Sequence, residues 1–409
     1  MASARHTFSR GFSANDDFDF ELRCVLGAAY SGAADVGEVL AAVDDVGDKD
    51  QRGWYEAWVG LGDRVAVQAD ASAQRSHAAS AASAYLRASL YYSVAVNTAS
   101  ALDSADELLS VFHKHRDAWD RFVETTPEAA ASRVSIPYEQ TSLPGYLFRP
   151  RGASGPLPLL IGTNGSDGSL SAMWSSCAFG ALRRGYAVLL YDGPGQQSML
   201  FDHATTFRPD WEAVLTPVLD FALGLDGIDA DRVAAYGISQ AGYWVTRALA
   251  FEHRFAAAIV DPGVVDVSTS WTSHLPKSML ELLQKGEDAK FDRDMEFAFK
   301  FERGPASIWA FRARPYGDLG YAQTLKAVQE YTVADIADRI TTPLLITSPE
   351  REQFWPGQSE RLAELTSSVS TLVPFTAAEG ADFHCQPLAR GLTDQRMFDW
   401  LDERMPQHS

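Results

Sequence analysis

The feature that most constrains this chain is an alternation of short apolar strands with helices, which begins near residue 134. Two segments typical of an antiparallel pair come first, VSIPYE and LPGYLFRP. The strands that follow are PLLIG, YAVLLY, RVAAY, AAAIV, PLLIT and STLVPF. Apolar strands that alternate with helices predict an α/β protein whose mostly parallel sheet is covered on both faces.

The chain divides into two regions that differ in predicted secondary structure. Residues 1–130 contain few strand signals, but apolar residues recur at helical spacing over 52–70, 80–98 and 104–125. We expect an all-helical N-terminal domain over 1–130 and an α/β domain over 131–409. About eighty residues separate AAAIV from PLLIT. They predict a helical insertion at about 265–335, between strands six and seven, over the edge of the sheet where such folds bind ligands.

Charge and cysteine content exclude several functions. The chain has 54 acidic and 35 basic residues and a net charge of −19, which repels phosphate backbones and anionic lipids. We therefore expect no nucleic-acid partner and no membrane partner. The three cysteines form no CxxC pair, so no metal site is predicted. The first twenty residues lack an apolar signal core and no 18-residue apolar run occurs, which predicts a cytoplasmic protein.

The strongest chemical signal is the segment GISQAG around Ser239, which directly follows the strand RVAAY and opens a helix. A tight strand–turn–helix junction of this kind projects a nucleophilic hydroxyl from the sheet. Small residues must flank the serine on both sides, and here they are Gly237 and Ala241. The alternative is a serine that caps a helix N-terminus.

A serine nucleophile needs a base and an orienting acid. His384 follows the last strand, where this topology places the base, and an exposed loop histidine is the alternative. The acid is expected after the strand PLLIT, and Glu352 lies four residues before Pro356, which favours it over Glu350. The order serine, acid, histidine is that of the α/β-hydrolases.

An oxyanion hole should complete such a site. One donor is expected to be the backbone N–H of Gln240, which directly follows the nucleophile. The other is expected from the Gly-rich loop after the strand PLLIG, where Ser166 is the predicted donor.

Five segments taken in order resemble the α/β-hydrolases that carry an N-terminal helical domain. They are NGSDG, YDGPGQQ, GISQAG, the acid loop that ends at Pro356, and EGADFHCQP. This group includes fermentation-respiration-switch esterases, bacterial 2,6-dihydroxypseudooxynicotine hydrolases and fungal yellowish-green pigment hydrolases that shorten polyketides. The resemblance implies the α/β-hydrolase fold and carries the family's serine, acid and histidine onto Ser239, Glu352 and His384. Ala241 in the elbow and Glu rather than Asp at 352 depart from the usual pattern and leave the subgroup open.

The resemblance also implies the chemistry. It implies hydrolysis of an ester, or of a carbon–carbon bond beside a carbonyl, in a bulky aromatic or polyketide-like small molecule, without metal or organic cofactor. An aromatic pocket could then include Trp174 and Trp355, together with Trp271 and Trp309, although tryptophans in such positions also serve as packing. Asp261 is a candidate auxiliary carboxylate, with a turn residue before Pro262 as the alternative.

Two other functions fit the same motifs. An acyltransferase would use the same triad with an alcohol or amine in place of water, and a non-catalytic binding protein could share the fold. The expected partner is a small-molecule substrate, and the resemblance implies a possible homodimer.

Overall fold

The structure is a computed structural model, and it describes residues 11–102, 104–153, 155–301 and 303–406. One sheet forms its centre, with strand order β1-β2-β4-β3-β5-β6-β7-β8. The strands are β1 (Ala129–Tyr138), β2 (Thr141–Pro150), β3 (Leu157–Thr163), β4 (Ala187–Tyr191), β5 (Ile228–Ile238), β6 (Ala257–Asp261), β7 (Leu344–Pro349) and β8 (Ser370–Phe375). The pairs β1–β2 and β2–β4 are antiparallel, and the other neighbours are parallel, as the sequence predicted.

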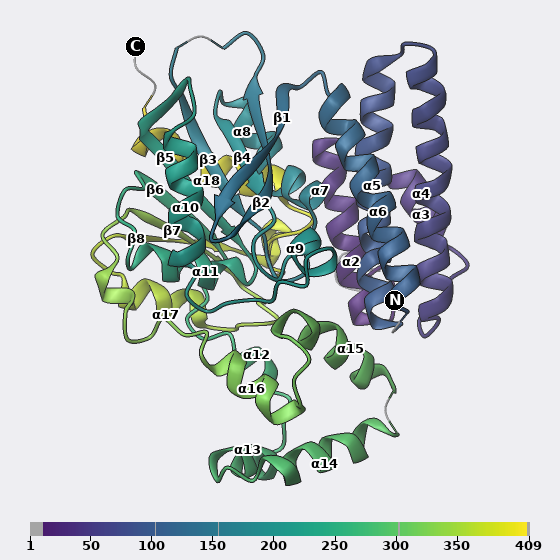
Figure 1. Cartoon of the computed structure of the whole chain (residues 1–409), viewed down its shortest axis with the longest axis vertical. Helices are drawn as coiled ribbons and strands as arrows, with labels where there is room; N and C mark the ends of the chain where they lie inside the picture. The colour runs from purple at the N-terminus through teal and green to yellow at the C-terminus, as the bar shows by residue number, and fades with distance from the viewer. Residues whose placement is uncertain (1–10, 103, 154, 302, 407–409) are drawn as a thin grey trace, which may run out of the picture.

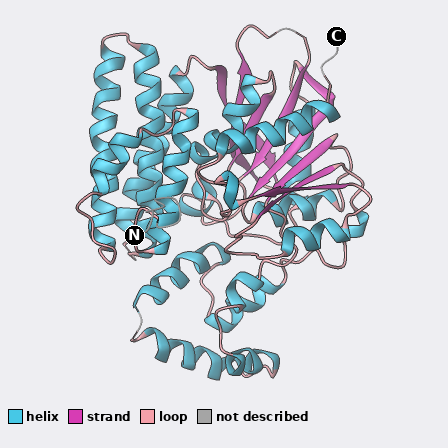
Figure 2. Cartoon of the chain, turned by 180° about the vertical axis from the view of Figure 1, so that it is seen from behind, coloured by secondary structure: helices cyan, strands magenta, loops and turns pink. Residues whose placement is uncertain are grey.

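The apolar runs of the central strands reflect burial on both faces of the sheet, since every residue of β4 and β6 is buried. Leu160 of β3 joins one hydrophobic core, whereas its neighbours Leu159 and Ile161 join a second core on the opposite face. The first core includes α7 (Leu170–Met173), α8 (Phe179–Arg183) and α18 (Arg390–Arg404); the second includes α10 (Glu212–Leu223), α11 (Ala241–Leu249) and α17 (Gln358–Leu365). Figure 2 shows the helices on both sides of the strands.

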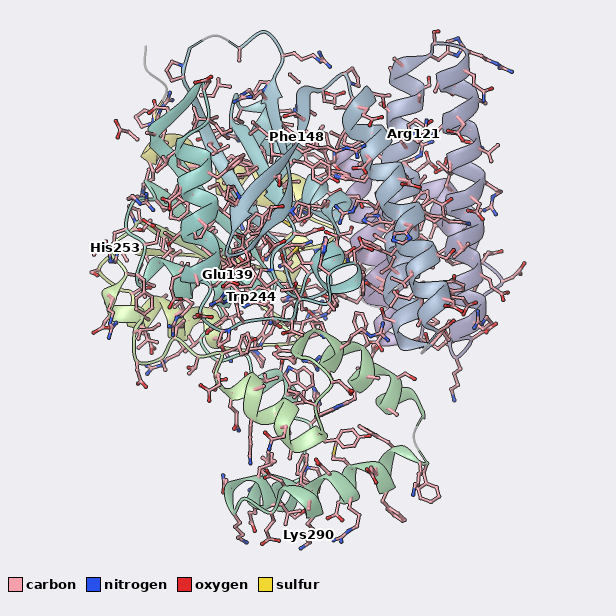
Figure 3. The ribbon with its side chains drawn as sticks, in the orientation of Figure 1. Arg121, Glu139, Phe148, Trp244, His253 and Lys290 are labelled. Atoms are coloured by element: carbon pink, nitrogen blue, oxygen red, sulfur yellow. The ribbon has the colours of Figure 1, made fainter. Side chains whose placement is uncertain are left out.

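The N-terminal helices stand beside the sheet (Figure 1). They are α2 (Asp16–Gly27), α3 (Val36–Val43), α4 (Gln51–Gln74), α5 (Ala78–Ala101) and α6 (Ala105–Thr125). The three long helices, α4 to α6, lie where the apolar spacing predicted them. Trp119 of α6 packs against Tyr146 and Phe148 of β2, with ring centroids 5.6 and 5.9 Å apart, so the helices share a core with the sheet. Figure 3 labels Phe148 on the sheet side facing these helices.

The residues between β6 and β7 form the predicted helical insertion. Its helices are α12 (Thr269–Thr272), α13 (Lys277–Gln284), α14 (Asp288–Phe299), α15 (Arg303–Ala313) and α16 (Tyr321–Gln329). In Figure 1 they lie below the sheet, and α15 returns toward the N-terminal helices. Helices α15 and α5 are in contact, so the insertion and the N-terminal helices meet.

Helix α2 lies directly against the loop that follows β8. A Cβ atom on Gly27, the last residue of α2, would lie 1.7 Å from the carbonyl oxygen of Pro387. The guanidinium of Arg23 lies over the ring of Phe383, 4.4 Å from its centroid. Only glycine at 27 lets the two backbones approach this closely.

The close approach at Gly27 gives a test of how α2 is held. We expect Gly27→Ala to lower the free energy of unfolding by about 1–3 kcal/mol, because backbone atoms must move apart. Gly60→Ala in α4 is the matched control, since the nearest atom to its added methyl would be the Arg64 guanidinium at 3.5 Å. That control should be neutral or stabilising by up to ~1 kcal/mol. Urea unfolding checks both, and equal effects in the two variants would contradict the packing described.

Candidate active site

Ser239 occupies the tight turn between β5 and α11. Its φ is +57°, a left-handed conformation that is uncommon for serine, and its N–H donates to the carbonyl oxygen of Asp261 at 2.7 Å. A Cβ on Gly237 would lie 2.4 Å from the carbonyl oxygen of Ala241, and one on Gly242 would lie 2.0 Å from that of Pro262. The turn therefore needs glycine at 237 and 242 and accepts the small, buried Ala241 between them.

The structure brings Ser239, His384 and Glu352 together in one chain of hydrogen bonds. Nε2 of His384 lies 2.9 Å from Oγ of Ser239, and Nδ1 lies 2.9 Å from each carboxylate oxygen of Glu352. A carboxylate only accepts hydrogen bonds, so Nδ1 carries the proton in neutral His384, and Nε2 is left to accept from the serine hydroxyl. The side chains of His384 and Glu352 are buried.

The carboxylate of Glu352 is held in its charged form. Burial alone would raise its pKa, but His384 and the N–H groups of Phe354 and Trp355 outweigh burial and hold the pKa below the ordinary value. Those two amides donate to Oε1 at 2.9 and 3.2 Å. Glu350, the alternative acid, is exposed and instead accepts from the N–H of Ala377 at 2.7 Å.

Aromatic rings and a main-chain contact fix the orientation of His384. Its N–H donates to Oε1 of Gln353 at 2.8 Å. Its imidazole lies 4.7 Å from the ring of Phe354, 5.7 Å from that of Trp355 and 6.1 Å from that of Phe20. Phe20 belongs to α2, so the N-terminal region contributes directly to the surroundings of this histidine.

Two backbone amides near Ser239 are candidates for the oxyanion hole. Gln240 and Ser166 both line the cavity at Ser239, and within the described parts of the chain neither backbone N–H has an acceptor. A Cβ on Gly165 would lie 2.9 Å from Cβ of Ser239, so this loop passes close to the nucleophile. The Gly165 N–H itself donates to Oδ1 of Asn164 at 2.8 Å. The N–H groups of Gln240 and Ser166 therefore remain the predicted oxyanion donors.

The cavity above Ser239 has a volume of about 1370 Å³. Its walls come from α2, α5, the insertion and the loops that carry Ser239 and His384. The aromatic residues in these walls are Phe18, Phe20, Phe201, Trp271, Phe299, Trp309, Phe311, Tyr316, Phe354, Trp355 and Phe383. Trp355, a predicted pocket residue, lines this cavity.

Two predicted pocket residues lie elsewhere. Trp174 is buried in the core, with its ring 4.8 Å from that of Phe122 and 5.5 Å from that of Phe148, and it does not line the cavity. Trp174 follows the first turn of a helix whose buried face packs on the sheet, which directs the indole away from the ligand side. The prediction that Trp174 forms a pocket wall is therefore wrong.

Asp261 lies behind the nucleophile turn rather than in the cavity. Its carboxylate accepts from the hydroxyl of Thr347 at 2.6 Å and from Nε2 of Gln386 at 3.0 Å, and the side chain is fully buried. Its backbone oxygen accepts from Ser239. Asp261 therefore supports the turn, and the prediction of an auxiliary carboxylate facing substrate is wrong.

The sequence analysis missed the contribution of α2. Asn15 caps this helix by accepting from the N–H groups of Asp17 and Phe18. Phe18, Leu22, Val25 and Leu26 are buried at helical spacing. These two signals are visible in the sequence and could have identified the helix, but they give no indication that Phe20 and Glu21 line the cavity.

Glu21 is a partly buried acid in the cavity wall. Its Oε2 accepts from the indole N–H of Trp54 at 2.8 Å. Burial raises the pKa of Glu21 to about 8, although the Trp54 hydrogen bond opposes this rise. The carboxyl is therefore mostly protonated at neutral pH and can donate a hydrogen bond.

The described residues contain neither a cluster of metal-binding side chains nor a helix that could span a membrane. No group of three or more His, Cys, Asp or Glu side chains there is placed to hold a metal ion. Within the same ranges, no helix is both long and apolar enough to cross a membrane.

Comparison with known proteins gives matches along nearly the whole chain. The model of the alpha/beta hydrolase family matches residues 159–389. Hydrolase acrC of Aspergillus aculeatus is 31% identical over 96% of this chain and 97% of its own length. The 20-hydroxy-prefusarin hydrolase FUS2 of Gibberella moniliformis is 28% identical over 95% of this chain and 96% of its own. The structure of 2,6-dihydroxy-pseudo-oxynicotine hydrolase, 19% identical, covers 93% of this chain and 95% of its own with a TM-score of 0.71, which confirms the predicted α/β-hydrolase fold.

The raised pKa of Glu21 gives a prediction for stability. Between its ordinary value of 4.5 and about 8, the folded state holds a proton that the unfolded state has released. The free energy of unfolding therefore falls as pH rises through this window, by at most about 1.4 kcal/mol per pH unit. Glu21→Gln keeps an acceptor for Trp54 but cannot ionise, so its stability advantage over the wild type should grow from about pH 5 to about pH 8.

Thermal unfolding across this pH range measures the effect. Glu56→Gln is the matched control, because Glu56 is an exposed glutamate on α4, and it should not change the slope. A Glu21→Gln variant whose stability follows that of the wild type at every pH would contradict the protonated carboxyl.

Proposed function

This chain belongs to the alpha/beta hydrolase family and is a hydrolase, and we propose that it acts through an acyl-enzyme formed on Ser239. The single observation that carries the proposal is the unbroken hydrogen-bond chain from Oγ of Ser239 through His384 to the carboxylate of Glu352. Three further features support it: a buried acid, a fixed imidazole tautomer and two free amides beside the nucleophile.

In the first step, Oγ of Ser239 attacks the substrate carbonyl while Nε2 of His384 takes the hydroxyl proton. The carbonyl oxygen becomes an oxyanion, which accepts hydrogen bonds from the N–H groups of Gln240 and Ser166. Glu352 keeps the imidazole oriented and stabilises the imidazolium that forms. The tetrahedral intermediate then collapses, the bond to the leaving group breaks, and Nε2 returns its proton to that group.

In the second step, water replaces the leaving group. Nε2 of His384 removes a proton from this water as its oxygen attacks the acyl carbon, and a second oxyanion forms at the same amides. Collapse releases a carboxylic acid and returns the proton to Oγ of Ser239. The protein's own residues therefore supply every proton transfer.

The bond that is cleaved is an ester bond, or a carbon–carbon bond beside a carbonyl whose leaving group is stabilised as an enolate. The substrate we propose is a bulky aromatic or polyketide-like small molecule. The cavity of about 1370 Å³ with its aromatic walls supports this size and character. Two matched proteins are named for hydroxylated organic molecules, 20-hydroxy-prefusarin and 2,6-dihydroxy-pseudo-oxynicotine, which is consistent with such a substrate.

The contact between Glu352 and His384 predicts that replacing the carboxylate of Glu352 with an amide strongly lowers kcat. We expect Glu352→Gln to lower kcat on the order of 10³- to 10⁴-fold, because an amide can donate to Nδ1 and favour the wrong imidazole tautomer. Steady-state hydrolysis of a 4-nitrophenyl ester measures this loss. Circular dichroism and thermal unfolding show whether the variant is folded.

Glu350→Gln is the matched control for this experiment. It makes the same chemical change two residues away, on an exposed side chain that contacts Ala377 rather than His384. Its turnover should stay within about twofold of the wild type. Loss of activity in Glu350→Gln with retention in Glu352→Gln would reverse the assignment of the acid.

The class of bond can be tested with two substrates. Wild type and Ser239→Ala are incubated with an aryl ester and with an aryl β-diketone, and the products are identified by mass spectrometry. We expect the wild type to release an acid from at least one of them, and Ser239→Ala to lose turnover by about 10⁴-fold or more. Equal turnover in Ser239→Ala would contradict the proposal. A product formed only when an alcohol or amine is added would indicate acyl transfer instead of hydrolysis.

A further inference from the structure

Arg312 is a cation in the cavity wall for which the described residues provide no carboxylate partner. It lies on α15, and its guanidinium donates to Oγ of Ser270 at 2.9 Å and to the carbonyl oxygen of Ser270 at 3.4 Å. The guanidinium also lies over the ring of Trp271, 4.5 Å from its centroid. Across the described ranges, no Asp or Glu oxygen lies within 4.0 Å of it. An arginine has five N–H donors, so Ser270 satisfies only part of the group.

Four other arginines in the described part of the chain, with side chains at most 13% exposed, each have a carboxylate partner. Buried guanidinium groups form ion pairs at Arg23 with Asp19, Arg116 with Asp192, Arg232 with Asp229 and Arg390 with Asp261. Such pairing is expected, because a buried charge without a counter-charge is costly. The chain has 54 acidic residues and a net charge of −19, yet no described carboxylate pairs with Arg312.

The position of Arg312 links it to the reacting centre. Trp271, on which it stacks, lies 5.7 Å from the ring of Tyr316, and the hydroxyl of Tyr316 lies 3.2 Å from Nε2 of Gln240. Gln240 directly follows the nucleophile. Arg312 and Ser239 both line the cavity.

The charge around Arg312 suits an anionic ligand. Burial lowers the pKa of the Arg312 guanidinium from its ordinary value, while Tyr316, Asp167 and Asp17 partly offset this effect. Burial also raises the pKa values of Asp17 and, to about 8, of Glu21. Asp17, whose charge acts on Arg312, is thus a weaker acid than an exposed aspartate, and a ligand anion would satisfy the free guanidinium donors.

We propose that Arg312 is a specificity-determining residue that binds an anionic pair of coplanar oxygens on the substrate, beside the acyl group that Ser239 attacks. The planar guanidinium fork matches two coplanar oxygens that share a negative charge. A carboxylate and the enolate of a 1,3-dicarbonyl unit both have this chemistry. The inference rests on the proposed function, since it assigns the substrate class of the same site.

The carboxylate source is tested with two esters of matched chain length. One is 4-nitrophenyl hydrogen glutarate, whose acyl chain ends in a carboxylate, and the other is the neutral 4-nitrophenyl pentanoate. The measured quantity is the ratio of kcat/KM for the anionic ester to that for the neutral ester. We expect Arg312→Met to lower this ratio by about tenfold or more, and Arg312→Lys to give an intermediate ratio.

The enolate source is tested by binding. Isothermal titration calorimetry of Ser239→Ala compares 1-phenylbutane-1,3-dione with the monoketone 1-phenylbutan-1-one at a pH where the dione is partly ionised. We expect Ser239→Ala to bind the dione more tightly than the monoketone. The double variant Ser239→Ala/Arg312→Met should bind the dione about tenfold or more weakly than Ser239→Ala does. Binding without hydrolysis separates this inference from the proposed function.

A matched control removes the same charge far from the cavity. Arg121 is exposed on α6, where Figure 3 labels it, and Arg121→Met should leave both the ester ratio and the dione affinity unchanged. A purely structural role of Arg312 would lower both kcat/KM values together and leave their ratio constant, and that result would overturn the inference. If the wild type hydrolyses neither ester, the Ser239 proposal fails for esters. The dione affinity with and without Arg312 then decides the inference alone.

Discussion

The structure depends on the close approach of three backbone segments around Ser239. The end of β5, the start of α11 and the segment after β6 meet so tightly that Gly237 and Gly242 have no room for a Cβ atom. The backbone bond from Ser239 to Asp261 holds the serine at a positive φ, which side-chain sterics disfavour. The buried carboxylate of Asp261 fixes the same segment from behind. The hydroxyl position is therefore set by the sheet itself.

The base is held by elements that are distant in sequence. The loop after β8 carries His384, and α2 packs against that loop through Gly27 and Arg23. Phe20 from the same helix lies beside the imidazole. The N-terminal region thus both supports the base and closes one side of the cavity, while the insertion between β6 and β7 closes the other.

The residues of the site that follow strands could be predicted from the sequence. The apolar runs locate the strands, and the order of the motifs along the chain assigns a residue to the end of each one. Ser239, Glu352 and His384 are of this kind, and the structure brings them within hydrogen-bond distance. Trp174 could not be placed correctly, since its direction depends on which helix face packs on the sheet. Arg312 could not be identified from the sequence, because the lack of a carboxylate partner among the described residues is a property of the assembled cavity.

The central claim is that Ser239 is an activated nucleophile open to the cavity. Intact-mass analysis after treatment with a fluorophosphonate tests it most directly, with wild type and Ser239→Ala measured side by side, because the probe reacts covalently with an activated serine. The account predicts one adduct on the wild type and none on Ser239→Ala. A folded wild type that gains no adduct, or a Ser239→Ala variant that is labelled equally, would contradict it.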